Sequence, residues 1–443
     1  MSSRQERWLS REVFGWAMFD FANQAFTLVI LTTMFQIYFI EYVVPEDPSL
    51  GRRLWATSGM ITQVVIILVA PILGALADFM GAKKRLLFMT YIGCVLFTAS
   101  LGLVPPGATA WRMVHFIVAY FFYAAGANFM SSFLPELAHH RNMGKVSAFG
   151  WTLGYVGGLL CLAGAVVLTS LWEGPIGYRL VTVWAGLFFL AAAIPTFLLL
   201  RERKQAEPMP EGHTYLTVGF HRLADTFRHL RMYGRLFEFL LIMTLYFGGV
   251  QIVYWFAGTL TKELFGFDDR KMGLFILQIT VTAIVGAVLT GRYQDRFGAR
   301  NFLLGCLIFW TVTILTAALA TEEWVFWTVG NAVGLGIGAI GTASRAMVGL
   351  FSPAHKAAEF FGFYGLFHKL SAILALGAVT VLEFVFRGDF HRVVAASSGF
   401  FVLGFFLLLK VDEKAGRLAA LRAEQAYRRR LRSHESLAGA SPQ

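Results

Sequence analysis

Long apolar windows alternate with short polar connections from one end of the chain to the other. Each window holds about 20 residues, which is the length that an α-helix needs to cross a bilayer. Backbone groups in lipid must be hydrogen-bonded within their own segment, so the pattern predicts an all-α membrane protein with twelve transmembrane helices. The predicted spans are residues 12–40, 52–77, 84–104, 111–136, 145–170, 177–200, 236–262, 271–294, 301–320, 324–348, 356–384 and 392–410.

Composition and charge agree with this class and give an orientation. The 443 residues are 57% hydrophobic and 15% charged, whereas soluble chains are about 25% charged. If the N-terminus is inside, 28 of the 38 Lys and Arg residues fall in cytoplasmic segments and nine in outer loops. Cytoplasmic loops carry the basic excess, so both termini are predicted to be cytoplasmic. This bias accounts for most of the net charge, and no nucleic-acid partner is predicted.

Cysteine usage and motif searches favour neither a metal protein nor an enzyme. Cys94, Cys161 and Cys306 lie in three different predicted helices, without the spacing of metal ligands. The sequence contains no HExxH, no GxSxG and no GxxxxGK[ST] pattern, which are the signatures of zinc proteases, serine hydrolases and nucleotide-driven proteins. No cofactor and no metal are therefore expected.

Two loops repeat one another and divide the chain into halves. GALADFMGAKKR covers residues 74–85 and GRYQDRFGARN covers residues 291–301. Three pairs share an offset of 217 residues: Gly74 with Gly291, Asp78 with Asp295, and Gly81 with Gly298. This predicts a cytoplasmic N-terminus (1–11), two pseudo-symmetric six-helix halves (12–200 and 236–410), a linker with an interfacial amphipathic helix (201–235) and a basic cytoplasmic tail (411–443).

At these loops the chain resembles the major facilitator superfamily, whose pattern is close to G-x-x-x-D-R-x-G-R-[KR]. Phe79 stands where the first copy usually has arginine, whereas the second copy keeps Arg296. The resemblance implies that the loops act in gating, and the alternative is that their charges only fix topology. The gating candidates are Gly74, Asp78, Gly81, Lys83, Lys84, Gly291, Asp295, Arg296, Gly298, Arg300 and Arg345.

A narrower resemblance covers most of the chain. It rests on GWAMFDFANQAF (15–26), VSAFGWTLGYVGG (146–158), Ser344–Arg345 and EFFGFYGLFHK (359–369). These segments are similar to the bacterial branch of the vacuolar amino-acid effluxer family, which is named for its role in autophagy. The resemblance implies export of neutral amino acids or related solutes across a bacterial inner membrane. One departure is Gly248–Gly249, where members often carry Asp-Gly.

A polar stripe on the first predicted helix is the leading candidate site. Residues three, four and seven apart share a helix face, so Trp16, Asp20, Asn23, Gln24 and Thr27 line up. Asp20 lies eight residues past Glu12, about 12 Å into the membrane. Intramembrane charges usually face a cavity or a partner and mark transport pathways. We expect the stripe to face substrate, and the alternative is a hydrogen-bonded lock between helices.

Lys369 is the second charge at depth. It lies 13 residues past Lys356, about 20 Å from the inner end of its helix, with Gly362 and Gly365 on the same face. Substrate binding or gating is expected, and a permanent salt bridge is the alternative. Asn128 and Tyr254 are further pocket candidates. A zwitterion would match a cavity that holds one carboxylate, from Asp20, and one ammonium, from Lys369.

These features predict a secondary active transporter that works by alternating access. Its expected cargo is an amino acid or related metabolite, exported with protons as the coupling ion. The chain is expected to act as a monomer in the lipid bilayer. A channel would need polar lining on several helices, and only one strong stripe is visible. A lipid or lysolipid flippase on the same fold stays open as the alternative.

Overall fold

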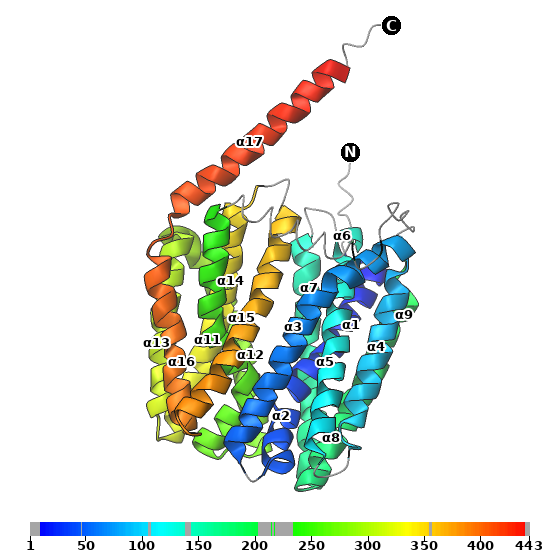
Figure 1. The fold of residues 1–443 in the computed structure, drawn as a ribbon, viewed down its shortest axis with the longest axis vertical. Helices are drawn as coiled ribbons and strands as arrows, with labels where there is room; N and C mark the ends of the chain where they lie inside the picture. Colours follow the sequence, from blue (N-terminus) through cyan, green and yellow to red (C-terminus); the bar gives the residue numbers. More distant parts are fainter. Residues whose placement is uncertain are drawn as a thin grey trace. The chain divides into compact units, whose positions relative to one another are not determined.

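The computed structural model describes residues 9–45, 47–104, 108–137, 143–202, 214, 217, 234–353 and 357–438, which form helices and turns without any strand. Figure 1 shows the helices as a ribbon. The first half contains α1 (Arg11–Ala25), η1 (Phe26–Thr32), α2 (Met34–Tyr38), η2 (Phe39–Val43), α3 (Pro48–Met80), α4 (Lys83–Ser100), α5 (Thr109–Ser131), α6 (Leu134–Leu137), α7 (Met143–Leu171), α8 (Pro175–Ala192) and α9 (Ile194–Leu199). The second half contains α11 (Gly234–Phe265), α12 (Asp269–Phe297), α13 (Ala299–Leu319), α14 (Glu323–Phe351), α15 (Ala357–Val385) and α16 (Phe390–Leu408), followed by α17 (Glu413–Ala438).

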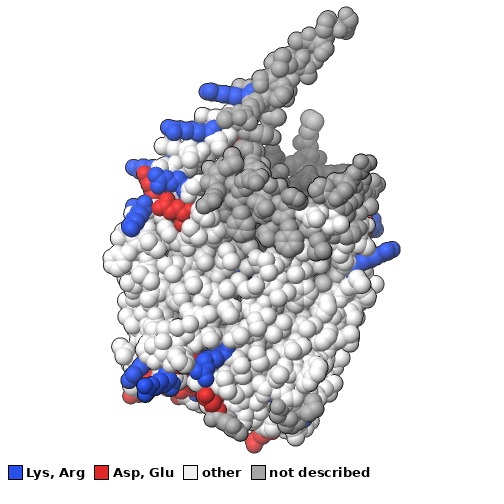
Figure 2. Space-filling model, viewed as in Figure 1, with Lys and Arg blue, Asp and Glu red and all other residues white. Residues whose placement is uncertain are grey.

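Eleven helical stretches within the described residues are long and apolar enough to cross a membrane. They correspond to eleven of the twelve predicted spans. The remaining span, predicted at 84–104, is α4, which has 18 residues and begins with Lys83, Lys84 and Arg85. On the face that Figure 2 shows, charged side chains gather at the two ends of the helices, and the described belt between them is uncharged. That belt is the surface expected of a membrane-embedded bundle.

The chain divides into two compact units. Unit one comprises Met1–Ala224, Ile252–Leu277 and Leu376–Val393, and unit two comprises Asp225–Gln251, Gln278–Ala375 and Val394–Gln443. Unit one therefore holds the first half together with the ends of α11 and α15 and the starts of α12 and α16. The amphipathic helix predicted within 201–235 falls outside the described residues apart from Thr214 and Thr217.

A seam of glycines on α7 brings it against the first helix. The two elements pack along most of α1. A Cβ atom added to Gly157 would lie 2.0 Å from the Phe21 carbonyl oxygen, and one at Gly158 would lie 2.7 Å from Leu28 Cδ1. The contact at Gly157 is with the backbone of α1, which cannot give way without separating the helices, so the close approach depends on this residue being glycine. The seam holds the polar stripe of helix one in place.

Candidate functional site

The first membrane helix is discontinuous, whereas the sequence predicts one helix over 12–40. After α1 the backbone widens into the π-helix η1, and Thr33 breaks it with φ −131° and ψ −96°. The Thr32 hydroxyl donates to the Thr27 carbonyl at 2.8 Å, and the Thr33 hydroxyl donates to the Leu28 carbonyl at 2.5 Å. Threonine hydroxyls compete for helix carbonyls, so the sequence TLVILTT from Thr27 to Thr33 explains the break.

The break lies against a kink in α11. Phe256 has non-helical backbone angles of φ −119° and ψ 17°. A kink frees carbonyl groups from the helix ladder, and the Trp255 carbonyl accepts a hydrogen bond from Gln36 Nε2 at 2.6 Å. A Cβ at Gly258 would lie 3.1 Å from the Thr32 carbonyl oxygen. Two irregular helices therefore meet within unit one, which is how many transporters build a binding site.

Asp20 lies on α1, six residues before η1 begins, and faces α7. It is half-buried, and a Cβ added to Gly150 would lie 2.5 Å from its Oδ2 atom. Among the described side chains, none forms an ion pair or a hydrogen bond with the Asp20 carboxylate. A carboxylate at such depth usually has a partner or a ligand. The Asp20 carboxylate is therefore unpaired within the described part of the chain.

The remaining polar residues of the stripe continue from Asp20 toward the break. Asn23 is 8% exposed, and its Oδ1 atom accepts no hydrogen bond from the described residues. Gln24 packs on α7, with its Cγ atom 3.0 Å from where a Cβ of Gly154 would lie. The Thr27 hydroxyl is 2.6 Å from the Tyr123 hydroxyl of α5. An orphan buried acceptor calls for an explanation, and a bound solute supplies one.

Tyr254 and Asn128 flank this stripe from other helices. Tyr254, on α11, lies near Thr27 and Thr32 and within electrostatic range of Tyr123. Asn128, on α5, is half-buried. The structure thus brings Asp20, Asn23 and Tyr254 of the predicted set together in unit one. Tyr123 lies beside these residues as well. It was not predicted from the sequence, because one aromatic residue within an apolar window looks the same as its neighbours in the helix.

Lys369 belongs to unit two, where it lies on α15 beside His368. The half-buried His368 is 3.1 Å from Gln251 through the Nε2 atoms of both side chains. Its ring packs edge-on against Phe247 and stacks on Tyr364, over which Arg345 lies at 5.9 Å from the ring centroid. His368 Nδ1 accepts or donates no hydrogen bond among the described residues. His368 was not among the residues predicted from the sequence.

Aromatic rings cover Gly248 and Gly249, the pair at which the sequence departs from the family that it resembles. A Cβ at Gly248 would lie 2.9 Å from a ring carbon of Phe400, and one at Gly249 would lie 2.5 Å from a ring carbon of Phe401. Both contacts lie within unit two. A side chain at Gly248 would therefore require the Phe400 ring to move.

The two repeated loops have matching local structures. Gly81 ends α3 with φ 57°, and Gly298 precedes α13 with φ 79°, conformations that favour glycine. In unit one the Lys84 backbone N–H donates to Glu202 at 2.7 Å. In unit two the Arg300 backbone N–H donates to Glu413 at 2.9 Å. Each half thus caps its third helix with a glutamate that follows its sixth.

The basic residues of the loops have further partners within their own unit. Lys83 Nζ pairs with Glu136 at 2.7 Å, and Lys84 Nζ donates to the Leu200 carbonyl at 2.5 Å. Arg296 lies over the Tyr293 ring at 5.7 Å. A shallow pocket of about 750 Å³ opens beside the first loop, lined by Gly81, Arg85, Phe88 and Glu202 among others. The Asp78 and Asp295 side chains lie outside the described part of the chain.

Comparisons with known proteins give the fold and the family. The chain is 25% identical over 414 residues to the MFS-type transporter YxiO of Bacillus subtilis, covering 90% of this chain and 94% of that one. It superimposes on the nucleoside transporter NupG with a TM-score of 0.71 and 12% identity, over 90% of this chain and 99% of NupG. A D-xylose–proton symporter gives a TM-score of 0.66 and 16% identity, over 92% and 98%.

These similarities confirm the predicted fold of twelve helices in two halves. The family described as vacuole effluxer Atg22-like matches residues 56–421, which is most of the chain. The segments 146–158 and 359–369, on which the sequence resemblance partly rests, lie within that match, and the first helix lies outside it. The chain is a membrane transporter of the major facilitator superfamily and belongs to the vacuole effluxer Atg22-like family.

Proposed function

We propose that this protein exports a small solute, an amino acid or a related metabolite, by alternating access. The observation that carries the proposal is the Asp20 carboxylate, which lies on α1 against Gly150 of α7 without an ion pair or hydrogen bond among the described side chains. A fixed negative charge without a protein partner suits the ammonium group of an amino acid. The orphan Asn23 acceptor, one turn further along the helix, suits a second donor of the same ligand.

Lys369 supplies the opposite charge in this proposal, because a zwitterion also carries a carboxylate. Protons are the proposed coupling ion, since buried carboxylates commonly serve as proton carriers in transporters. Solved structures with a similar fold are named as a peptide transporter and as a D-xylose–proton symporter. The cargo proposed for this protein therefore rests on its own side chains and not on these names.

The experiment that tests this function is a screen of purified protein in liposomes. Labelled neutral amino acids, short peptides and lysolipids are offered with and without a pH gradient. We expect the protein to transport at least one amino acid across the liposome membrane, and to transport it faster when a pH gradient is present. Movement of lysolipids alone would contradict the proposal and support a flippase. Transport at the same rate with and without the pH gradient would show that protons are not the coupling ion.

Orientation is proposed from the basic residues, with both termini in the bacterial cytoplasm. A cysteine introduced at Ala438, at the end of α17, should resist an impermeant thiol reagent in intact cells. One at Glu173, an exposed residue between α7 and α8, should react. The native Cys94, Cys161 and Cys306 are all buried, so background labelling is low. The opposite pattern of labelling would invert the proposed topology.

The repeated loops are proposed to latch the cytoplasmic side through Asp78 and Asp295. Each single change, Asp78→Asn or Asp295→Asn, should slow transport several-fold by weakening one state of the cycle, while the protein still inserts. One or two weakened hydrogen bonds of about 1 kcal/mol each correspond to a change of this order. Transport assays on both variants test this. If both variants transport solute at the rate of the parent protein, the charges of Asp78 and Asp295 only fix the orientation of the helices in the membrane.

A further inference from the structure

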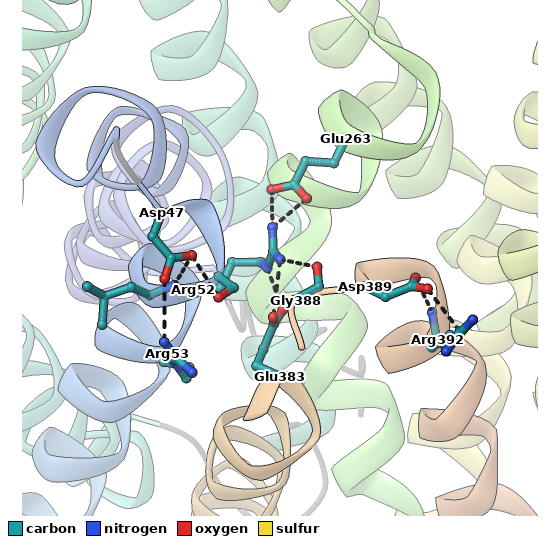
Figure 3. Close-up of polar contacts among 10 residues, drawn as sticks. Asp47, Arg52, Arg53, Glu263, Glu383, Gly388, Asp389 and Arg392 are labelled. Atoms are coloured by element: carbon teal, nitrogen blue, oxygen red, sulfur yellow. Dashed lines mark hydrogen bonds and ion pairs between the residues drawn. The ribbon is translucent and has the colours of Figure 1, made fainter. Parts of the chain in front are cut away.

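Arg52, near the start of α3, binds two carboxylates that come from distant parts of the chain (Figure 3). Its Nη1 donates to both oxygens of Glu263, at 2.6 and 2.5 Å. Its Nε and Nη2 donate to the two oxygens of Glu383, with an Nη2–Oε2 distance of 3.1 Å. Nη2 also donates to the Gly388 carbonyl at 2.9 Å. Every nitrogen of the guanidinium is therefore engaged.

The three charged side chains differ in exposure. The Arg52 side chain is 2% exposed and that of Glu383 is 0%, whereas Glu263 is 29% exposed. The Phe390 ring covers the guanidinium, with its centroid 4.7 Å from Cζ. A buried guanidinium needs such partners because an unpaired charge in the interior is costly. Glu263 is the member of the cluster that reaches the surface.

The cluster joins elements that belong to different halves of the sequence. Arg52 belongs to the first half, whereas Glu263 ends α11 and Glu383 ends α15 in the second half. All three lie within unit one, at the helix ends that the charge bias predicts to be outside. In alternating access the halves separate on one side at a time. When the outer side opens, Arg52 must leave both carboxylates together.

A second ion pair beside the cluster breaks in the same movement. Lys262, the neighbour of Glu263, binds Glu41 of the first half at 2.9 Å and donates to the Tyr178 hydroxyl at 2.9 Å. Adjacent helix residues point about 100° apart, so Lys262 does not take the place of Arg52 on Glu263. The end of α11 is thus held from two directions while the outer side is closed.

The other charged side chains around the cluster are already engaged or exposed. Tyr178 donates to Asp269 at 2.9 Å, and Arg387 is exposed in the turn after α15. The Ser49 hydroxyl donates to Asp47 at 2.8 Å and lowers the pKa of that carboxyl, which keeps it charged beside Arg53. The remaining pairs join Asp47 to Arg53 at 3.6 Å and Asp389 to Arg392 at 2.9 Å.

Opening leaves two carboxylates side by side. Glu263 and Glu383 both bind one guanidinium, so they are separated by little more than its width. Two carboxylates that share a site do not both stay ionised, since each disfavours the charge of the other. We propose that Glu263 and Glu383 form a proton-binding site, occupied by Arg52 while the outer side is closed and by a proton while it is open. The inference rests on the alternating-access cycle proposed above.

The direction of the pH effect follows from linkage. The open state binds the proton and the closed state binds Arg52, so acid outside favours opening. Closing returns Arg52 to the carboxylates and expels the proton. For one proton the ratio of open to closed protein changes by at most about tenfold per pH unit.

A buried threonine below the cluster provides a reporter. Thr259 precedes Glu263 by one helical turn, is 3% exposed and has a hydroxyl without a hydrogen bond among the described residues. In Thr259→Cys, an impermeant thiol reagent should reach the sulfur only after the outer side opens. The labelling rate of Thr259→Cys is divided by that of Glu173→Cys, which is labelled separately under the same conditions. This ratio removes the effect of pH on the reactivity of the thiol itself.

The variants separate the cluster from its surroundings. We expect the labelling ratio of the parent to rise as external pH falls, by up to about tenfold per unit. Glu263→Gln and Glu383→Gln should label several-fold faster at neutral pH and lose the pH response. Arg53→Gln is the matched control, because Arg53 neighbours Arg52 but pairs with Asp47 in its own helix cap; it should behave as the parent.

Two outcomes would overturn the inference. One is a pH response that persists in both Glu263→Gln and Glu383→Gln. The other is a Thr259→Cys site that stays unlabelled in Arg52→Gln protein that is monodisperse on gel filtration. If Arg52→Gln does not fold, Glu263→Gln decides, because it leaves Arg52 paired with Glu383. The readout needs no substrate, and Asp20→Asn should keep the pH response of labelling, so failure of the proposed cargo would be distinguishable.

Discussion

Asp20→Asn is expected to abolish transport while leaving the protein folded. The carboxylate has no partner among the described residues, so the change strands no cation, and asparagine fits the space beside Gly150. A lost charged hydrogen bond to substrate costs about 1.5–3 kcal/mol, which corresponds to roughly a 10- to 150-fold loss of apparent affinity. Uptake by purified protein in liposomes measures the effect, with size-exclusion profiles as the check on folding.

A surface carboxylate gives the matched control. Glu238→Gln removes one negative charge from α11 but affects only an exposed pair with Arg235 at 3.4 Å, so transport should match the parent. Lys369→Ala should also abolish transport of a zwitterion. Parent-like uptake of every solute by both Asp20→Asn and Lys369→Ala would show that neither charge binds substrate. Recovery of folding only in the double variant would instead mark the two residues as a structural pair.

Among substitutions that add one methyl group to a described glycine of the first half, Gly157→Ala is expected to be the most destabilising. The added Cβ would lie 2.0 Å from the Phe21 carbonyl oxygen and 2.7 Å from its carbonyl carbon. These atoms belong to the backbone of α1, so relief requires the two helices to separate. Overpacking of this kind costs about 1–3 kcal/mol or more. Thermal unfolding in detergent, followed by size-exclusion chromatography, should show a lowered midpoint and less assembled protein.

Gly305→Ala is the control for this change. Gly305 lies in the middle of α13, and a Cβ there would meet nothing within 4 Å. Alanine is favoured over glycine within a helix by about 0.5–1 kcal/mol, so the midpoint should stay or rise slightly. Equal midpoints for Gly157→Ala and Gly305→Ala would show that α1 and α7 are not held together by this seam.

The first helix illustrates where reasoning from sequence succeeds and where it stops. Helical spacing identified Trp16, Asp20 and Asn23 as one polar face, and the structure brings them together against α7 and α5. The break at Thr33 was not predicted, because TLVILTT is as apolar as the rest of the window. It forms because the threonine hydroxyls take carbonyls from the helix ladder while the kinked α11 packs against the gap.

Sequence alone determined the class, the number of helices, the two halves and the family, since lipid imposes apolar windows of fixed length and duplication leaves a constant offset. Only the tertiary structure decided which polar groups meet. Arg52 lies 211 residues from Glu263 and 331 from Glu383, and no local pattern relates them. In the sequence, each of these three residues looks like an ordinary charged residue near a helix end. Their partnership depends on how helices pack, and packing is set by many weak contacts that periodicity does not record.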